Sequence, residues 1–209
     1  PFDGIVLQKG LAEHYSKKYK INNILSYKVP PLIVKVNGKT SIDPDSELSL
    51  LNCSLDYALE LGAKAIGYTL YLGSRKESEM MVEASKVQEY CRSNKLPFIL
   101  WAYPKLSYAK ELELDPKTIS YCSRVAYEMG ADLVKLKLPV FNESFSLSDK
   151  IEILSEIVMQ ANTTKVLFQG GKHTERSEFI ENVRMLRESG ASGMAIGRNI
   201  WSHPMPDEL

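Results

Sequence analysis

The sequence predicts an α/β protein in which helices cover a parallel sheet. Short apolar segments alternate with longer segments of helical periodicity along the 209 residues, and this alternation is typical of a parallel sheet. The apolar segments lack a regular polar alternation, which indicates strands buried on both faces. A Gly-Ala pair also recurs where a helix is expected to end and a strand to begin, at Gly62, Gly130 and Gly190. This recurrence indicates repeated βα units.

Seven strands are expected, which limits the architecture to two choices. The strands centre on Val6, Val34, Gly67, Leu100, Val134, Leu167 and Ala195. Seven is one short of the closed (βα)8 barrel, the TIM barrel. A doubly wound open sheet is the alternative, but it would ordinarily carry a glycine-rich first turn for a nucleotide, and residues 7–10 are not such a turn.

Helices are expected between these strands, with boundaries set by capping residues and glycines. Residues 40–49 form a polar segment that predicts a loop. The expected helical segments are 10–19 (helix or turn), 54–62, 77–94, 115–129, from 148 or 149 to 160, and 177–189.

Composition excludes several classes of function. Lys+Arg and Asp+Glu number 26 each, so net charge offers no support for binding of nucleic acid or a membrane surface. No segment has the pattern of a signal peptide or a membrane span, and we expect a soluble, cytoplasmic protein. The cysteines and histidines are scattered, which predicts neither a disulfide framework nor a metal site. They are Cys53, Cys91 and Cys122, and His14, His173 and His203.

The strand within 130–139 carries two lysines in an apolar run. Side chains alternate along a strand, so Lys135 and Lys137 share one face. If that face lines a barrel interior, burial and the neighbouring cation lower the pKa of an amine, and a neutral lysine can form a Schiff base with a carbonyl substrate. The alternative is a solvent-facing strand whose lysines extend into water.

Reactive residues of parallel α/β folds cluster at the carboxyl ends of the strands. Trp101 and Tyr103 share a face at the end of the preceding strand. Tyr103 beside Lys135 is a candidate proton-transfer pair, since a phenol near an ammonium has a lowered pKa. The alternative is that these aromatic rings simply pack. Lys35 and Asn37 are weaker candidates for substrate contact, and a solvated Lys35 is the alternative.

The last two strands end in glycine-containing turns that predict a phosphate site. These turns are Gln169-Gly170-Gly171 and Gly197-Arg198. Glycine lets backbone N–H groups approach an anion, and an arginine binds phosphate oxygens in a bidentate fashion. Each turn by itself is also compatible with a simple tight turn. Both turns together favour phosphate, as in many barrels.

Seven sequence segments resemble the archaeal-type class I fructose-1,6-bisphosphate aldolases, within the wider group of Schiff-base aldolase barrels. The segments span nearly the whole chain and follow one another in the same order as in that family. They are residues 2–10, 36–40, 52–54, 67–71, 101–104, 130–137 and 197–201.

The resemblance implies a metal-independent lyase with no cofactor and a lysine imine. It makes Lys135 the Schiff-base lysine, Tyr103 the catalytic tyrosine and Trp101 the tryptophan beside it. We expect Trp101 to shape the pocket and Lys137 to lower the pKa of Lys135. It makes Gly170, Gly171, Gly197 and Arg198 the phosphate site. The implied reaction is the reversible cleavage of fructose 1,6-bisphosphate to dihydroxyacetone phosphate and glyceraldehyde 3-phosphate in glycolysis and gluconeogenesis, by a homo-oligomer whose partner is the phosphorylated sugar.

The chain departs from the family pattern at three places. A first strand with an Asp-His-Gly signature is not found ahead of residues 2–4, Gln169 stands where the family has serine, and residues 201–206 stop before a full closing helix. We therefore expect a single barrel domain over 1–209 that lacks its first strand and is truncated at both ends.

Three other functions remain open at this point. The same site in a related Schiff-base aldolase or transferase would act on another phosphorylated carbonyl compound. A catalytically silent barrel would bind a phospho-sugar without forming an imine. A barrel fragment would fold only after pairing with another chain, because seven strands leave an open edge.

Overall fold

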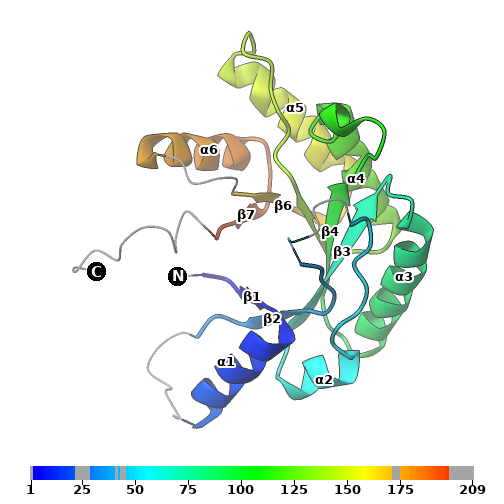
Figure 1. The fold of residues 1–209 in the computed structure, drawn as a ribbon. Coiled ribbons are helices and arrows are strands. Elements are labelled where there is room, and N and C mark those ends of the chain that lie inside the picture. The colour runs from blue at the N-terminus through cyan, green and yellow to red at the C-terminus, as the bar shows by residue number, and fades with distance from the viewer. Residues whose placement is uncertain (1, 22–28, 41, 43–45, 171–174, 198–209) are drawn as a thin grey trace.

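The computed structural model in Figure 1 describes residues 2–21, 29–40, 42, 46–170 and 175–197. All seven expected strands and all six expected helical segments are present there. The elements are β1 (Ile5–Leu7), α1 (Lys9–Ile21), β2 (Leu32–Lys35), α2 (Leu55–Glu60), β3 (Ala65–Leu72), α3 (Glu77–Ser93), β4 (Phe98–Pro104), the 3-10 turn η1 (Lys110–Leu112), α4 (Pro116–Glu128), β5 (Leu133–Leu136), α5 (Leu147–Gln160), β6 (Lys165–Gln169), α6 (Arg176–Glu188) and β7 (Gly193–Ala195).

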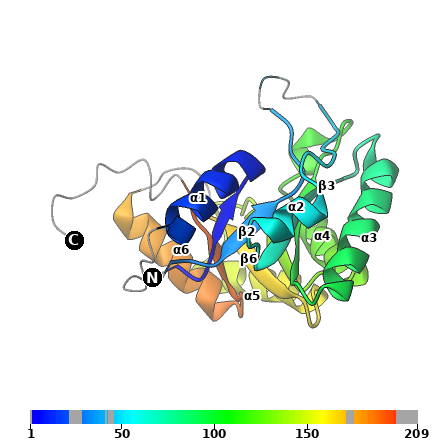
Figure 2. The ribbon, with the colours of Figure 1, turned by 90° about the horizontal axis from the view of Figure 1, so that it is seen from below.

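The strands form one parallel sheet whose order in space, β1 to β7, is their order in the chain. Figures 1 and 2 show this sheet curled, with the helices on its convex side. A doubly wound sheet would reverse its strand order and carry helices on both faces. The fold is therefore a curled half-barrel of seven strands, and the doubly wound alternative is excluded.

Glycines end three of the helices as the recurring Gly-Ala pair predicts. Gly62, Gly130 and Gly190 have φ of +87°, +72° and +82°, a left-handed conformation that L side chains rarely adopt. Each glycine turns the chain directly into the next strand. Side chains of Ser54 and Asp115 cap the opposite ends of α2 and α4, accepting hydrogen bonds from the first turn.

The start of α5 differs from the prediction of residue 148 or 149. The helix begins at Leu147, because Ser146 is its N-cap and exchanges hydrogen bonds with Asp149 in a capping box. This arrangement satisfies backbone donors that the first turn would leave unpaired.

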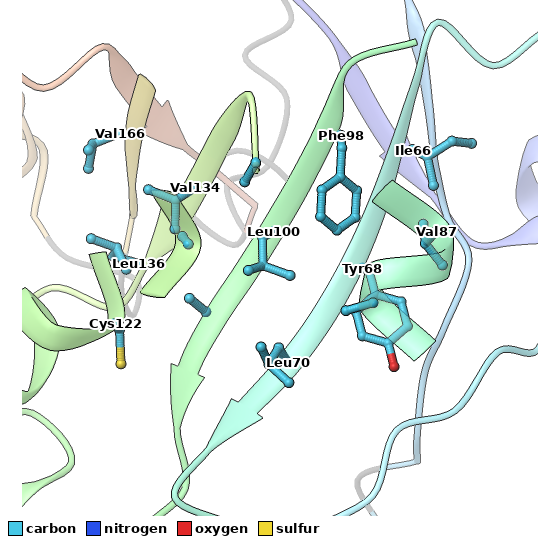
Figure 3. Close-up of a cluster of buried hydrophobic side chains, with 14 of the residues drawn as sticks. Ile66, Tyr68, Leu70, Val87, Phe98, Leu100, Cys122, Val134, Leu136 and Val166 are labelled. Atoms are coloured by element: carbon cyan, nitrogen blue, oxygen red, sulfur yellow. The ribbon is translucent and has the colours of Figure 1, made fainter. Parts of the chain in front are cut away.

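Most of the hydrophobic core lies between the sheet and its helices. Figure 3 shows Leu100, Val134 and Leu136 in this layer, all fully buried. A second, smaller cluster lies on the opposite, concave face and contains Ile99 and Trp101. The two faces of one strand therefore belong to different layers, as the twofold alternation of side chains requires.

The cysteines Cys53, Cys91 and Cys122 are all buried and free. Among the helices that the structure describes, none is long and apolar enough to cross a membrane.

Candidate active site

The strand register brings the predicted lysine and aromatic residues together on the concave face. Trp101 pairs with Lys135 across β4 and β5, and it pairs with Thr69 on its other side. Tyr103 lies two residues further along β4, opposite Tyr71 of β3. Val134 and Leu136, the neighbours of Lys135 in the chain, are buried on the other face. Lys135 therefore points into the curl of the sheet, away from the helices.

Lys135 contacts both aromatic side chains. Its Nζ donates a hydrogen bond to the Tyr103 hydroxyl. The same Nζ lies 5.1 Å from the centroid of the Tyr103 ring and 5.9 Å from that of Trp101. An amine in such a position is partly desolvated and close to a group that can exchange a proton with it.

The pKa of Lys135 is lowered to about 8. Burial is the larger cause, and the positive charge of Lys35 is the second. The predicted direction is confirmed, but the predicted source of the charge is wrong. Lys137 lies just beyond the end of β5, and its Nζ is 3.2 Å from Glu113 Oε2. This ion pair offsets the charge of Lys137. The cation that acts on Lys135 comes instead from β2, three strands away.

The expected lowering of the Tyr103 pKa is also wrong. Burial raises the pKa of this phenol, and the nearby Tyr71 raises it further. Desolvation disfavours the phenolate more than the neighbouring amine favours it. Tyr103 is therefore protonated at neutral pH and begins any reaction as a proton donor.

Gly67 makes room for Trp101, which sequence reasoning missed. A Cβ at Gly67 would lie 2.2 and 2.4 Å from two atoms of the Trp101 ring. The ring therefore occupies the space beside β3 where any other residue would place its side chain. A glycine within an otherwise apolar strand often marks such a close approach, and this signal was available in the sequence.

Asn37 is used for structure and not for substrate contact. Its side chain donates to the carbonyl oxygens of Ser49 and Thr69, both at 2.8 Å, and accepts from Thr69 N at 2.7 Å. Its amide is thereby committed to joining β3 to the chain after β2. Lys35, the other weak candidate on this segment, donates from Nζ to the Asn37 carbonyl oxygen at 3.0 Å.

The predicted phosphate residues are only partly within the described structure. Gln169 ends β6 and pairs with Ala195 of β7, and Gly170 N donates to Ala195 O at 2.9 Å. That N–H is consequently not free for an anion. Gly197 lies two residues beyond β7, whereas Gly171 and Arg198 lie outside the described residues. The phosphate site stays a prediction.

No group of three or more histidine, cysteine, aspartate or glutamate side chains is arranged to hold a metal ion in the part of the chain that the structure describes. The ionisable groups around Lys135 there are the lysines Lys35 and Lys137, the tyrosines Tyr71 and Tyr103, and Glu113, which is paired with Lys137.

Comparison with protein families gives a match over residues 2–203 to the DeoC/LacD family aldolase model. Among curated proteins, the chain is 36% identical over 201 residues to "Fructose-bisphosphate aldolase class 1" of Halobacterium salinarum, which covers 95% of this chain and 69% of that protein. It is also 36% identical to the protein of the same name from Thermoproteus tenax, over 96% of this chain and 69% of that one.

A solved structure has the same fold. An archaeal fructose-1,6-bisphosphate aldolase, with its catalytic lysine covalently bound to the carbinolamine intermediate of the substrate, superposes with a TM-score of 0.82 at 33% identity. The match covers 97% of this chain and 73% of that one.

Proposed function

Because this chain belongs to the DeoC/LacD family of aldolases, we propose that it is a class I fructose-1,6-bisphosphate aldolase that forms an imine on Lys135. The observation that carries this proposal is the contact of a partly neutral lysine with a protonated tyrosine on the concave face. The curated relatives and the solved structure carry the same activity in their names.

The first step needs an uncharged amine. With a pKa of about 8, the Lys135 amine is neutral in about a tenth of molecules at pH 7, whereas an ordinary lysine is neutral in fewer than about one in a thousand. The neutral amine attacks the C2 carbonyl of the sugar and forms a carbinolamine. The Tyr103 hydroxyl donates its proton to the departing oxygen, so water leaves and a positively charged iminium remains.

The second step breaks the carbon–carbon bond. The Tyr103 phenolate is stabilised by the iminium beside it, and it accepts the proton of the C4 hydroxyl. The electron pair of the C3–C4 bond moves to the iminium, which becomes a neutral enamine, and glyceraldehyde 3-phosphate leaves. Protonation of the enamine and hydrolysis of the imine release dihydroxyacetone phosphate. Trp101 forms the apolar wall beside Lys135 and excludes water from the amine.

We also propose that the ends of β6 and β7 bind a phosphate of the sugar. Gln169 and Gly170 are adjacent to β7 by strand register, and Gly171, Gly197 and Arg198 follow in the sequence. Binding a remote phosphate would hold the reacting carbonyl against Lys135 and reduce the entropic part of the barrier.

The finer points of architecture belong to the same proposal. The curled sheet and its chain-order pairing support one TIM-like barrel domain over residues 1–209. We also propose that the barrel has an eighth strand, that the protein assembles as a homo-oligomer, and that it is located in the cytoplasm.

Borohydride trapping tests the proposal directly. The protein is incubated with dihydroxyacetone phosphate and borohydride, and tryptic peptides are analysed by mass spectrometry. We expect a reduced adduct on Lys135, together with cleavage of fructose 1,6-bisphosphate in a coupled assay. Lys137→Met should keep the adduct, because Lys137 is paired with Glu113. An adduct on another lysine, or cleavage without any adduct, contradicts the proposal.

A further inference from the structure

Lys35 is a second lysine on the concave face, and the proposed mechanism does not use it. It ends β2 and pairs in register with Gly67 of β3, whose neighbour across the sheet is Ile99 of β4. Ile99 and Trp101 share the inner face. Lys35 therefore lies on the same face as Lys135, one row nearer the amino ends of the strands.

The position of the Lys35 ammonium is set by a rigid acceptor. Lys35 Nζ donates to the Asn37 carbonyl oxygen at 3.0 Å, and Gln8 Nε2 donates to the same oxygen at 3.2 Å. The Asn37 side chain is itself held by three hydrogen bonds to Ser49 and Thr69. The ammonium cannot move far without losing this contact.

The charge of Lys35 has no acidic partner within the described residues. Its ammonium donates to a neutral carbonyl, and burial lowers the pKa of Lys35. Gly67, beside it in the sheet, presents no side chain that could shield it. A cation in this situation acts on other charges in the same concavity with little screening.

The groups that face Lys135 come from three strands and from the segments that follow η1 and β5. They are Trp101 and Tyr103 of β4, Tyr71 of β3 opposite Tyr103, Lys35 of β2, and Lys137 after β5 with Glu113 paired to it. Trp101 is uncharged, the two phenols have raised pKa values, and Lys137 is offset by Glu113. Lys35 supplies the one charge in this set without a counter-charge among the described residues.

We propose that Lys35 is a positioning residue that keeps Lys135 in its neutral, nucleophilic form by like-charge repulsion across the concave face. The proposal rests on the proposed function only for its biological role, because the effect on Lys135 exists without substrate. The lowered pKa of Lys135, with Lys35 as its second cause after burial, supports it.

The test measures the reactivity of the Lys135 amine without substrate. Trinitrobenzenesulfonate modifies neutral amines, and mass spectrometry of the Lys135 peptide follows its rate from pH 6 to 11. In the unmodified protein we expect the midpoint of this rate–pH curve near pH 8. In Lys35→Met the midpoint should rise by about 0.5–1 unit, so the rate at pH 7 falls about three- to tenfold. Lys35→Arg keeps the charge and should keep the midpoint.

A matched control and a second neutral variant complete the experiment. Lys165→Met removes an exposed lysine at the start of β6 and should leave the midpoint unchanged. Lys35→Gln removes the charge but keeps a donor for the Asn37 carbonyl, so it should shift the midpoint as Lys35→Met does. Circular dichroism melting identifies any variant that does not fold.

An unchanged midpoint in the folded neutral variants overturns the inference. If the KM for fructose 1,6-bisphosphate rises in those variants while the midpoint is unchanged, Lys35 is a substrate contact instead. If the midpoint shifts as expected but borohydride traps no imine in the unmodified protein, the inference holds and the proposed function fails.

Discussion

The convex and concave faces of the sheet are built from the same strands, but the convex face packs against the helices and the concave face carries the candidate active site. On the convex face, Leu100, Leu136 and Phe168 are completely buried against helices. On the concave face, the same strands present Tyr103 and Lys135, which are only partly buried. Burial of apolar groups stabilises the fold. Partial burial of a lysine destabilises the fold but lowers the pKa of its amine, so that more of the amine is neutral and reactive. One strand therefore supplies both stability and chemistry through the alternation of its side chains.

Replacing Lys135 should have the largest effect and separate the two faces most clearly. Lys135→Met removes the amine that forms the imine, so kcat/KM should fall at least about 10⁴-fold. The variant should give no borohydride adduct. Residual activity within about tenfold of the unmodified protein would show that another residue carries the reaction.

The same variant should be more stable than the unmodified protein at neutral pH. The folded-state pKa of Lys135, about 8, lies below the unfolded value near 10.5, so folding is opposed by the charged amine below about pH 8. That cost disappears as the pH rises from 8 to 10.5. Lys135→Met should therefore stabilise by about 1–2 kcal/mol at pH 7, after allowance for partial exposure and for the lost Tyr103 contact. Urea unfolding at pH 7 and pH 10.5 should show the gain only at pH 7.

Tyr103→Phe should impair the chemistry without preventing imine formation. Removing the proton donor and acceptor should lower kcat about 10²- to 10³-fold. Dihydroxyacetone phosphate should still be trapped on Lys135, more slowly, because the amine remains. Full loss of trapping would mean that Tyr103 is needed to hold Lys135 in place. Stability should change little, since the ring that packs in the concavity is kept.

Leu100→Ala tests the convex face of the strand that carries Trp101 and Tyr103. Loss of a completely buried leucine should destabilise the protein by about 2–4 kcal/mol. Below the melting transition, kcat should stay within about twofold, because the inner face is unchanged. Val82→Ala on α3, where the valine is 59% exposed, should change stability by less than about 0.5 kcal/mol. A large loss of kcat in folded Leu100→Ala would show that the faces are coupled.

Gly67→Ala should have the smallest effect and test the close packing of the concave face. The added methyl group would overlap the Trp101 ring, so we expect about 1–2 kcal/mol of destabilisation. In a Trp201→Phe background, the fluorescence of Trp101 should shift as its ring moves. Gly10→Ala in α1, where the methyl group meets nothing within 4 Å, should instead stabilise by about 0.5–1 kcal/mol. An unshifted Trp101 emission would contradict the packing argument.

Much of the fold could be predicted from local patterns. Apolar runs located the strands, and the glycines at Gly62, Gly130 and Gly190 located helix ends. Helix α5 begins at Leu147, earlier than the predicted residue 148 or 149, because Ser146 and Asp149 form a capping box whose residues are visible in the sequence.

The electrostatics of the site could be predicted less well. The partner of Lys137 is Glu113, in the connection between β4 and α4, and the charge near Lys135 comes from Lys35, a hundred residues earlier in the chain. Neither the ion pair of Lys137 nor the repulsion between Lys35 and Lys135 has a local signal in the sequence. The Tyr103 pKa was predicted in the wrong direction because burial outweighed the neighbouring amine.

The sequence by itself determined the alternation of strands and helices, the sharing of one strand face by Trp101 and Tyr103, and the family resemblance. These properties follow from side-chain periodicity and backbone preferences over a few residues. Only the tertiary structure decided which charges meet, how deeply each group is buried and why Gly67 has no side chain. Those properties depend on strands distant in the chain, because electrostatic and packing interactions act through space.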